Sequence, residues 1–183
     1  LSSVVNNICS TQNWNQTIAQ SDGTIKKESK FISNINQQII SGSSLHIGNP
    51  HYKTPKEICR LNSDFDVIDL TNSDFEYLPR TSFYPVVDSN EYKIRTPKVS
   101  WSKNEPHFNF YRMVHRRMFS TTSERSLISA IIPKKVSHIN TAISTTIKDV
   151  SVLMNFHGLC CSIIYDFIVR SSGRSDLYAE SLH

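Results

Sequence analysis

The sequence contains no uninterrupted apolar run of about 18 residues, the length that a membrane-spanning helix requires. It also has no opening stretch in which a charged segment precedes an apolar one, which is the pattern of a secretory leader. We therefore expect a cytoplasmic protein that has no membrane partner.

Disulfide and metal-binding patterns are missing as well. The four cysteines are Cys9, Cys59, Cys160 and Cys161. They form no C-x-x-C pair, which favours reduced, structural cysteines. The histidines show no ligand spacing with one another or with Cys59, so the sequence predicts no metal site. A zinc site at His46, His51 and Cys59 is kept only as a weak alternative.

A chain of 183 residues accommodates one domain with a sizeable core, with or without a peripheral lobe, but hardly two full domains. No internal repeat is present. The chain begins at Leu1 rather than at a methionine. We therefore expect a piece of a larger protein whose neighbouring segments hold the chemistry.

The charge is moderately basic, with a net charge of +4 and an isoelectric point near 8.9. Such an excess favours a polyanionic partner without identifying one. The clustering of the cations is more informative, because one short stretch holds Arg112, Arg116, Arg117 and Arg125.

Two regions of different composition follow each other along the chain. Residues 1–45 are rich in Ser, Asn, Gln and Thr with thinly spread apolar positions, which predicts a loosely structured entry segment. Residues 46–183 form the main domain. Its first part contains frequent prolines between Pro50 and Pro106, which restrict it to short extended pieces and ordered loops.

Strands and one long helix are predicted in the main domain. The strands cover 65–70, 111–119 and 126–132, and the last is apolar on both faces, which predicts a central place in its sheet. A helix from Asp149 to Arg170 is predicted from an apolar stripe, with Gly173 as its stop signal. The stripe consists of Val152, Phe156, Leu159, Ile163 and Phe167, and it is widened by Leu153, Cys160, Ile164 and Ile168. We therefore predict an α+β fold with a mixed, mainly antiparallel sheet backed by a long C-terminal helix.

The most informative segment runs from Tyr111 to Pro133 and has the sequence YRMVHRRMFSTTSERSLISAIIP. It resembles a pattern in the target-recognition domains of DNA adenine-N6 methyltransferases and of the restriction-modification enzymes built on them. That pattern is an aromatic residue and Arg, then Arg with hydrophobic residues, then Ser/Thr-x-x-Glu-Arg-Ser/Thr-Leu-Ile-x-Ala-Ile-Ile-Pro. Further pieces in the same order extend the resemblance over residues 45–178: GNPHYKTP from Gly48, DVIDL from Asp66, YLPRTSFYP from Tyr77, RTPK from Arg95 and YDFIVR from Tyr165.

The resemblance implies sequence-specific recognition of double-stranded DNA by the specificity domain of a type II restriction-modification or phage-defence adenine-N6 methyltransferase. The chain itself is then expected to be non-catalytic and to hold no cofactor or metal. S-adenosylmethionine, and magnesium if the parent protein also cuts DNA, would bind elsewhere in that protein. The expected partners are double-stranded DNA and the methyltransferase domain of the same polypeptide.

A surface that binds duplex DNA needs cations for the phosphates and forked or amide side chains for the base edges. On a strand, Arg112 and Arg116 share one face, while His115 and Arg117 share the other, so one set can face DNA. The candidate DNA-binding residues are Arg112, His115, Arg116, Arg117, Arg125, Lys134, Lys135, Lys53 and Arg80.

These signals have structural alternatives. The arginine cluster also fits a solvent-exposed strand in which Glu124 pairs with an arginine, and Glu124 and Arg125 fit a scaffold as well as a base-reading role. Asn49-Pro50-His51-Tyr52 is similar to the Asn-Pro-Pro-Tyr catalytic loop of the family, in which the aromatic ring stacks on a flipped adenine. However, His replaces the second proline and no glycine-bearing cofactor loop precedes it. We expect a turn or a DNA-contacting loop there.

Two other functions remain open. Asp69 with Glu91-Tyr92-Lys93 matches the short Asp…Glu-x-Lys pattern of metal-dependent nucleases, although this pattern is common and a convincing pair of core strands is missing. A protein-interaction module without DNA affinity is the other alternative. Trp101, beside Lys98 and Lys103, is the aromatic residue that best fits base stacking.

Overall fold

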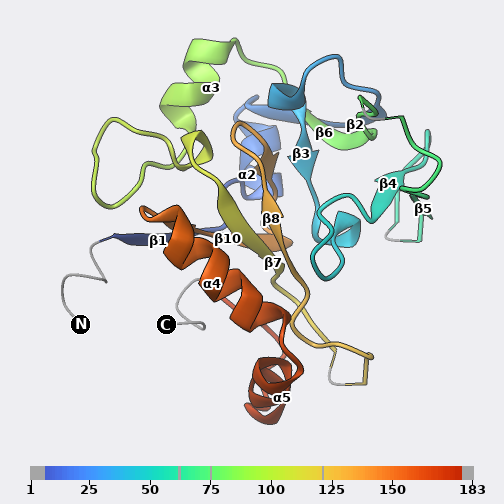
Figure 1. Ribbon diagram of the computed structural model, residues 1–183. Coiled ribbons are helices and arrows are strands. Elements are labelled where there is room, and N and C mark those ends of the chain that lie inside the picture. Colours follow the sequence, from blue (N-terminus) through green and yellow to red (C-terminus); the bar gives the residue numbers. More distant parts are fainter. Residues whose placement is uncertain (1–6, 62, 75, 121, 179–183) are drawn as a thin grey trace.

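A four-stranded antiparallel sheet forms the centre of the computed structural model, which describes residues 7–61, 63–74, 76–120 and 122–178 (Figure 1). The strand order is β1-β10-β7-β8. These strands are β1 (Ile8–Thr11), β10 (Ala142–Ile147), β7 (Arg112–Arg116) and β8 (Ser129–Ile132). Every residue of β10 is buried, because β10 lies between two neighbours and is covered on both faces.

Three two-stranded ribbons and several short helices surround this sheet. The antiparallel ribbons pair β2 (Ile25–Lys30) with β6 (Thr81–Pro85), and β4 (Lys53–Pro55) with β5 (Phe65–Val67). The parallel ribbon pairs β3 (Ile39–Ile40) with β9 (Ser137–His138). The short helices are α2 (Gln16–Ser21), α3 (Ser89–Arg95) and the 3-10 turns η1 (Ile35–Gln37), η2 (Gly42–Ser44) and η3 (His107–Asn109).

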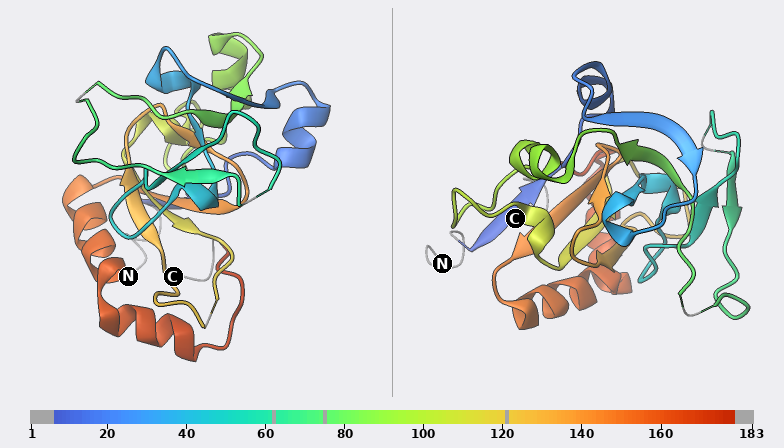
Figure 2. Two further views of the ribbon diagram at one scale, coloured as in Figure 1. Left: turned by 90° about the vertical axis from the view of Figure 1, so that its right-hand side faces the viewer. Right: turned by 90° about the horizontal axis from the view of Figure 1, so that it is seen from above.

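The central sheet is covered on both faces. Figure 2 shows α4 on one side of it and the β2–β6 ribbon on the other. Met113 on β7 packs into the cluster that contains Leu153 and Cys160 of α4, whereas the next residue, Val114, packs against Ile40. This alternation is what a strand with a period of two residues produces between two apolar layers.

The predicted α+β class is confirmed, but the predicted long helix is two helices, α4 (Val150–Cys161) and α5 (Ile163–Ser171). The chain bends by 69° between them. Ser162 is extended at the bend and accepts a hydrogen bond from the Tyr165 amide, so it ends α4 and caps α5. Asp149 caps α4 at the predicted start of the helix. Gly173, the predicted stop signal, has a positive φ of 67° just after α5.

The bend changes which side chains face the sheet. Several residues of the predicted stripe are largely exposed, with Ile163 at 77% and Phe167 at 68%. Leu153 and Cys160, which widen that stripe, are buried, and so is Val169, which the stripe did not include. No single described helix has the length and apolarity of a membrane span, and only the bent α4–α5 pair taken together passes that test.

Strand β8 lies at an edge of the sheet, not at its centre as predicted. Its residues are nevertheless largely buried, because α4 contacts it and the edge is partly capped by a loop. The Gly48 amide donates a hydrogen bond to the Ser129 carbonyl at 2.9 Å. The apolar sequence of β8 therefore reflects its burial under α4 and a loop, and not a central position in the sheet.

The entry segment is ordered over residues 7–45, in contrast to the prediction. Its strands β1, β2 and β3 pair with β10, β6 and β9. Trp14 is 7% exposed and its indole N–H donates to the Tyr92 hydroxyl at 2.7 Å. This segment supplies part of the core, so a structural boundary at residue 45 is not apparent.

A polar cluster lies inside the fold beside this contact. His138 is fully buried, its Nε2 lies 2.8 Å from the Ser144 hydroxyl, and its ring is 6.4 Å from that of His107. Burial and the nearby Arg112 cation lower the pKa of His138 to about 3, and the same causes hold the pKa of His107 well below its usual value.

These histidines predict acid destabilisation. Between pH 6.5 and about 3 the unfolded chain binds protons at His138 while the folded chain does not, so stability is lost as the pH falls through this window. His138→Gln should flatten the slope of unfolding free energy against pH by up to ~1.4 kcal/mol per pH unit. Urea unfolding at several pH values measures this slope. Ile143→Val, a buried change without a titrating group, should leave the slope as it is.

Candidate nucleic-acid interface

Two of the predicted DNA-binding residues, Arg112 and His115, lie inside the sheet. Arg112 is 0% exposed and donates to the Val136 carbonyl, and His115 is 1% exposed with Nε2 at 3.3 Å from the Leu177 carbonyl. Neither side chain reaches a surface that a duplex can approach. The alternative of a solvent-exposed charged strand does not describe β7 either.

Arg112 has no ion pair with any described residue, and its Nε and Nη1 atoms lack hydrogen-bond partners among them. Burial without a carboxylate lowers the pKa of Arg112 to about 9, partly offset by attraction to Tyr92. Arg112 is therefore a cation held inside the protein at an energetic cost.

Arg117 and Arg125 are occupied by intramolecular contacts. Arg117 Nε lies 3.6 Å from Asp176, and its guanidinium lies 5.6 Å from the Tyr178 ring. Arg125 Nε lies 3.4 Å from Asp166, and its Nη2 donates to the Cys161 and Ser162 carbonyls at 2.9 and 3.2 Å.

The contacts of Arg125 favour the scaffold alternative. Its cation lies at the C-terminal end of α4, where carbonyl groups without helical partners accept hydrogen bonds. Glu124 is exposed at the surface, and the carboxylate that pairs with Arg125 is that of Asp166.

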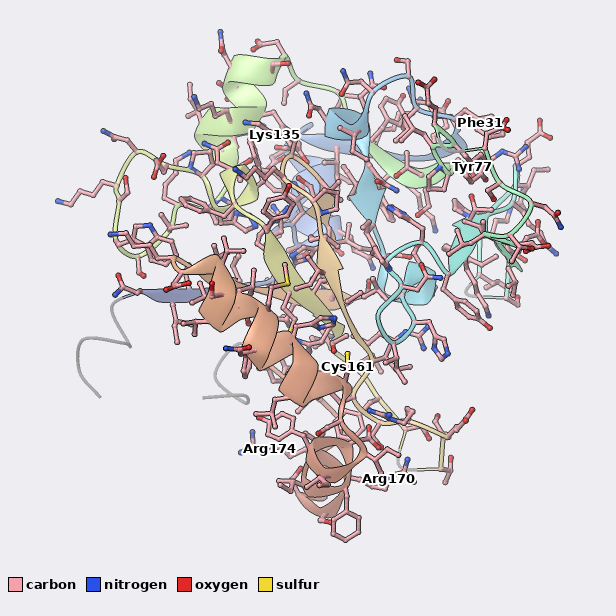
Figure 3. The ribbon with its side chains drawn as sticks, viewed as in Figure 1. Phe31, Tyr77, Lys135, Cys161, Arg170 and Arg174 are labelled. Atoms are coloured by element: carbon pink, nitrogen blue, oxygen red, sulfur yellow. The ribbon has the colours of Figure 1, made fainter. Side chains whose placement is uncertain are left out.

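Lys134 and Lys135 are exposed but lie at the far end of the β7–β8 pair. In the register, Arg112 faces Ile132 and His115 faces Ser129, so Lys134 and Lys135 follow the end opposite to Arg116. Figure 3 shows Lys135 near α3 and far from Arg170. Lys135 donates to Asn109 Oδ1 at 2.5 Å, and Lys134 lies over the Tyr111 ring.

Arg116 is a predicted arginine that lines a hollow at the end of β7. It lies at the end of β7, its Nε donates to the Gly42 carbonyl at 2.7 Å, and its Nη2 donates to the Leu45 carbonyl at 2.5 Å. Burial lowers the pKa of Arg116. The side chain lines a cavity of about 340 Å³ together with Lys53 and Thr141.

Two further hollows adjoin this cavity. One of about 290 Å³ shares Arg116 and Met118 with it and extends along the β7–β8 connection to Arg125. The other, of about 250 Å³, shares Ser43 and Thr141 with it and extends to β2, β5 and the loop before β5. Each of these two hollows shares lining residues with the first, and we call the three adjoining hollows together the basic groove.

The lining of the basic groove is strongly one-sided in charge. Its cationic residues are Lys27, Lys53, Arg60, Arg116 and Arg125, and none of the described residues that line it is an Asp or Glu. Ser43, Ser120, Ser123 and Thr141 add hydroxyl groups to the same lining. Cations together with hydroxyl donors are the chemistry that binds phosphate oxygens.

Some of the predicted DNA-binding residues line the basic groove and others do not. Lys53 and Arg116 line the basic groove, and neither forms an ion pair with a described residue. Arg80 instead stacks over the Phe31 ring at 4.4 Å. The sequence analysis missed Lys27 and Arg60, which line the third hollow. Nothing local marks these two residues, because the pairing of β2 with β6 and of β4 with β5 brings them to the groove.

The Asn49-Pro50-His51-Tyr52 segment forms a self-contained turn. Asn49 Oδ1 accepts a hydrogen bond from the His51 amide at 2.9 Å, and the Tyr52 ring lies 4.6 Å from that of His46. The Asn49 side chain and the aromatic ring are thus both engaged within the loop. The geometry supports the predicted turn.

The nuclease pattern does not assemble into a site. Asp69 accepts hydrogen bonds from Thr71 and Asn72 in its own loop, whereas Glu91 pairs with Arg95 on α3. Figure 1 places α3 and the loop after β5 on opposite sides of the molecule. Over the described ranges, no group of three His, Cys, Asp or Glu residues could hold a metal ion, and this includes His46, His51 and Cys59.

Trp101 is engaged with its own neighbours. Its ring contacts Phe110 edge-on at 5.5 Å, and Lys98 Nζ donates to the Lys93 and Ile94 carbonyls at the end of α3. Trp101 and Lys98 thus take part in the packing of their own loop, which does not favour a base-stacking role for Trp101.

Comparison with known proteins yields no match among protein-family models, curated proteins or solved structures.

The unpaired burial of Arg112 makes a stability prediction. Arg112→Met should leave the free energy of unfolding unchanged or raise it by up to about 3 kcal/mol, because an uncompensated buried charge is replaced by an apolar side chain. Arg125→Met should lower it by about 3 kcal/mol, since Asp166 loses a partner. Urea denaturation of both variants measures the two changes. A greater loss for Arg112→Met than for Arg125→Met would contradict this assignment.

Proposed function

We propose that this chain recognises double-stranded DNA in a sequence-specific manner, as the specificity domain of a restriction-modification adenine-N6 methyltransferase. The observation that carries the proposal is the basic groove, a set of three adjoining hollows with five cationic residues and no carboxylate in their described lining. The choice of this enzyme family rests on the resemblance of the motifs from Gly48 to Arg170, taken in their order along the chain. Methyl transfer from S-adenosylmethionine would be the task of a methyltransferase domain of the same polypeptide.

In this proposal, the free cations hold the DNA backbone. Lys27 and Arg60 are exposed and Lys53 is half-buried, so their charges can meet phosphates without first breaking an ion pair among the described residues. Arg116 is held by two carbonyls through Nε and Nη2, which fixes its guanidinium, and so its positive charge, in the lining of the hollows. The phosphate contacts fix the position of the domain on the duplex but carry no sequence information.

Sequence would be read by side chains at the two ends of the basic groove. At one end, Ser120 and Ser123 present hydroxyl groups, which can donate to or accept from base edges. At the other end, Gln16 supplies an amide and Arg60 a forked guanidinium. A methyltransferase bound beside this domain would then flip the target adenine out of the duplex.

The first test is Lys53→Gln, measured by fluorescence anisotropy on a random-sequence 20-base-pair duplex at several salt concentrations. Loss of one phosphate contact should weaken binding to all duplexes alike and reduce the slope of log affinity against log salt by about 0.9. Arg116→Ala should do the same, with an added loss of stability because two carbonyls lose their donor.

Lys103→Gln is the matched control, because Lys103 is an exposed lysine that does not line the basic groove. It should leave the salt slope unchanged although the net charge falls equally. Equal effects of the two substitutions would mean that the overall charge, and not the groove, attracts the duplex. A wild-type chain without salt-sensitive affinity for any duplex would remove the proposed function.

The protein-interaction alternative is favoured by one observation, the exposed apolar side chains of α5. Ile163, Ile164 and Phe167 are each more than two-thirds exposed. Apolar patches of this kind commonly mark a contact with another protein surface. This alternative predicts binding to a protein partner without any salt-dependent DNA affinity, so the salt titration also separates the two functions.

A further inference from the structure

One wall of the basic groove is attached to helix α5. This wall is formed by the connection between β7 and β8, including Ser120, Ser123, Arg125 and Ser126. Figure 1 shows the connection extending below the sheet next to α5, and Figure 3 shows Arg170 of α5 beside it. Backbone hydrogen bonds hold the start of the connection, where the Phe119 amide donates to the Ser175 carbonyl at 3.2 Å, and side-chain contacts hold the part from Ser123 to Leu127.

The contacts converge on Asp166, a carboxylate on the first turn of α5. Its Oδ1 accepts hydrogen bonds from the backbone amides of Ser126 and Leu127 at 2.8 and 2.7 Å. The same oxygen lies 3.4 Å from Arg125 Nε, and Oδ2 lies 3.6 Å from Arg170 Nη2. The Asp166 side chain is only 6% exposed. One buried carboxylate thus joins the end of the wall to the helix.

The two arginines extend this attachment along the wall. Arg170 Nη2 donates to the Ser123 and Glu124 carbonyls at 2.8 and 3.0 Å, and its Nε donates to the Ser126 hydroxyl at 3.1 Å. Arg125 donates to the Cys161 carbonyl at the junction of α4 and α5. The wall is therefore fixed to the helices by charge-assisted hydrogen bonds, which are the stronger kind.

We propose that Asp166 is the positioning residue of the basic groove, which holds the Ser120 and Ser123 side chains where they meet base edges. Discrimination between DNA sequences then depends on Asp166, whereas the general attraction to DNA does not. This inference rests on the proposed DNA recognition, and it adds the residue that makes that recognition selective.

The charge of Asp166 allows its positioning role to be separated from an electrostatic one. A carboxylate near a DNA-binding surface repels phosphates, so removing its charge should by itself strengthen binding to every duplex. Removing the anchor should instead weaken binding to the preferred sequence more than to others. The two effects have opposite signs for the preferred sequence, and a loss of fold alone would reduce both affinities together.

The test uses Asp166→Asn, which keeps the shape of the side chain but accepts weaker hydrogen bonds and attracts neither arginine. Selection of the wild-type chain on a randomised duplex pool first defines a preferred sequence, and affinities for that duplex and for a scrambled one are then measured. The ratio of the two affinities should fall about 10-fold, the order expected for losing contacts with one base pair. The affinity for the scrambled duplex should stay equal or rise.

Asp149→Asn is the matched control. Asp149 is likewise an acid at the start of a helix of the same pair, where it accepts hydrogen bonds from the Ser151 and Val152 amides, but it does not line the basic groove. It should retain the ratio of affinities. In amide hydrogen exchange, Ser126 and Leu127 should exchange faster in Asp166→Asn and at the wild-type rate in Asp149→Asn.

The outcomes separate the two proposals. A wild-type chain that prefers a sequence, together with an Asp166→Asn variant that keeps the full ratio or the full amide protection, would overturn the positioning role and leave DNA recognition standing. Absence of any duplex affinity in the wild type would overturn both. If Asp166→Asn does not fold, Arg170→Gln takes its place, because it removes the Ser123 and Glu124 contacts. A folded Arg170→Gln variant with an unchanged ratio would likewise overturn the positioning role.

Discussion

Strand β7 lies between helices on one face and the β3 and η2 segments on the other, so its side chains alternate between two apolar clusters. This burial decides which cations of the arginine-rich segment can meet an external partner. Arg112, the first residue of β7, is fully buried, whereas Arg116, its last residue, is only partly buried and lines the groove. Only the end of the strand can take part in binding, and the other groove cations must come from elsewhere in the chain.

The fold was predictable where a local signal has one physical meaning. Pro133 follows the last residue of β8 and Gly173 follows α5 with a positive φ, both as expected, and α4 begins directly after Asp149, where the sequence places the helix start. The sequence does not show the bend at Ser162, because a serine is tolerated inside a helix and the apolar spacing continues across it. The edge position of β8 was equally hidden, since an apolar strand looks the same whether strands or a helix and a loop cover it.

The groove was predictable only in part, because it is a product of strand pairing. Lys53 and Arg116 were both candidates, and they are 63 positions apart in a chain that brings them to one hollow. Lys27 and Arg60 join them through two ribbons whose partners lie far away in the sequence. By contrast, Lys134 and Lys135 are close to the arginines in sequence but sit at the opposite end of the β7–β8 pair. Closeness in the sequence therefore led to the inclusion of Lys134 and Lys135, which lie away from the groove, and to the omission of Lys27 and Arg60, which line it.

The bend between α4 and α5 creates the hydrogen-bonding groups that attach the groove wall to the helices. Ending α4 at Cys161 leaves carbonyl groups without helical partners, and Arg125 supplies both the hydrogen bonds and the positive charge that this helix end favours. Beginning α5 at Ile163 places Asp166 in a first turn, where a negative charge is favoured. The two side chains meet because one helix ends where the next begins. A continuous helix would satisfy those carbonyls internally and leave Arg125 without its acceptors, so the break in the helix is what fixes the wall of the groove.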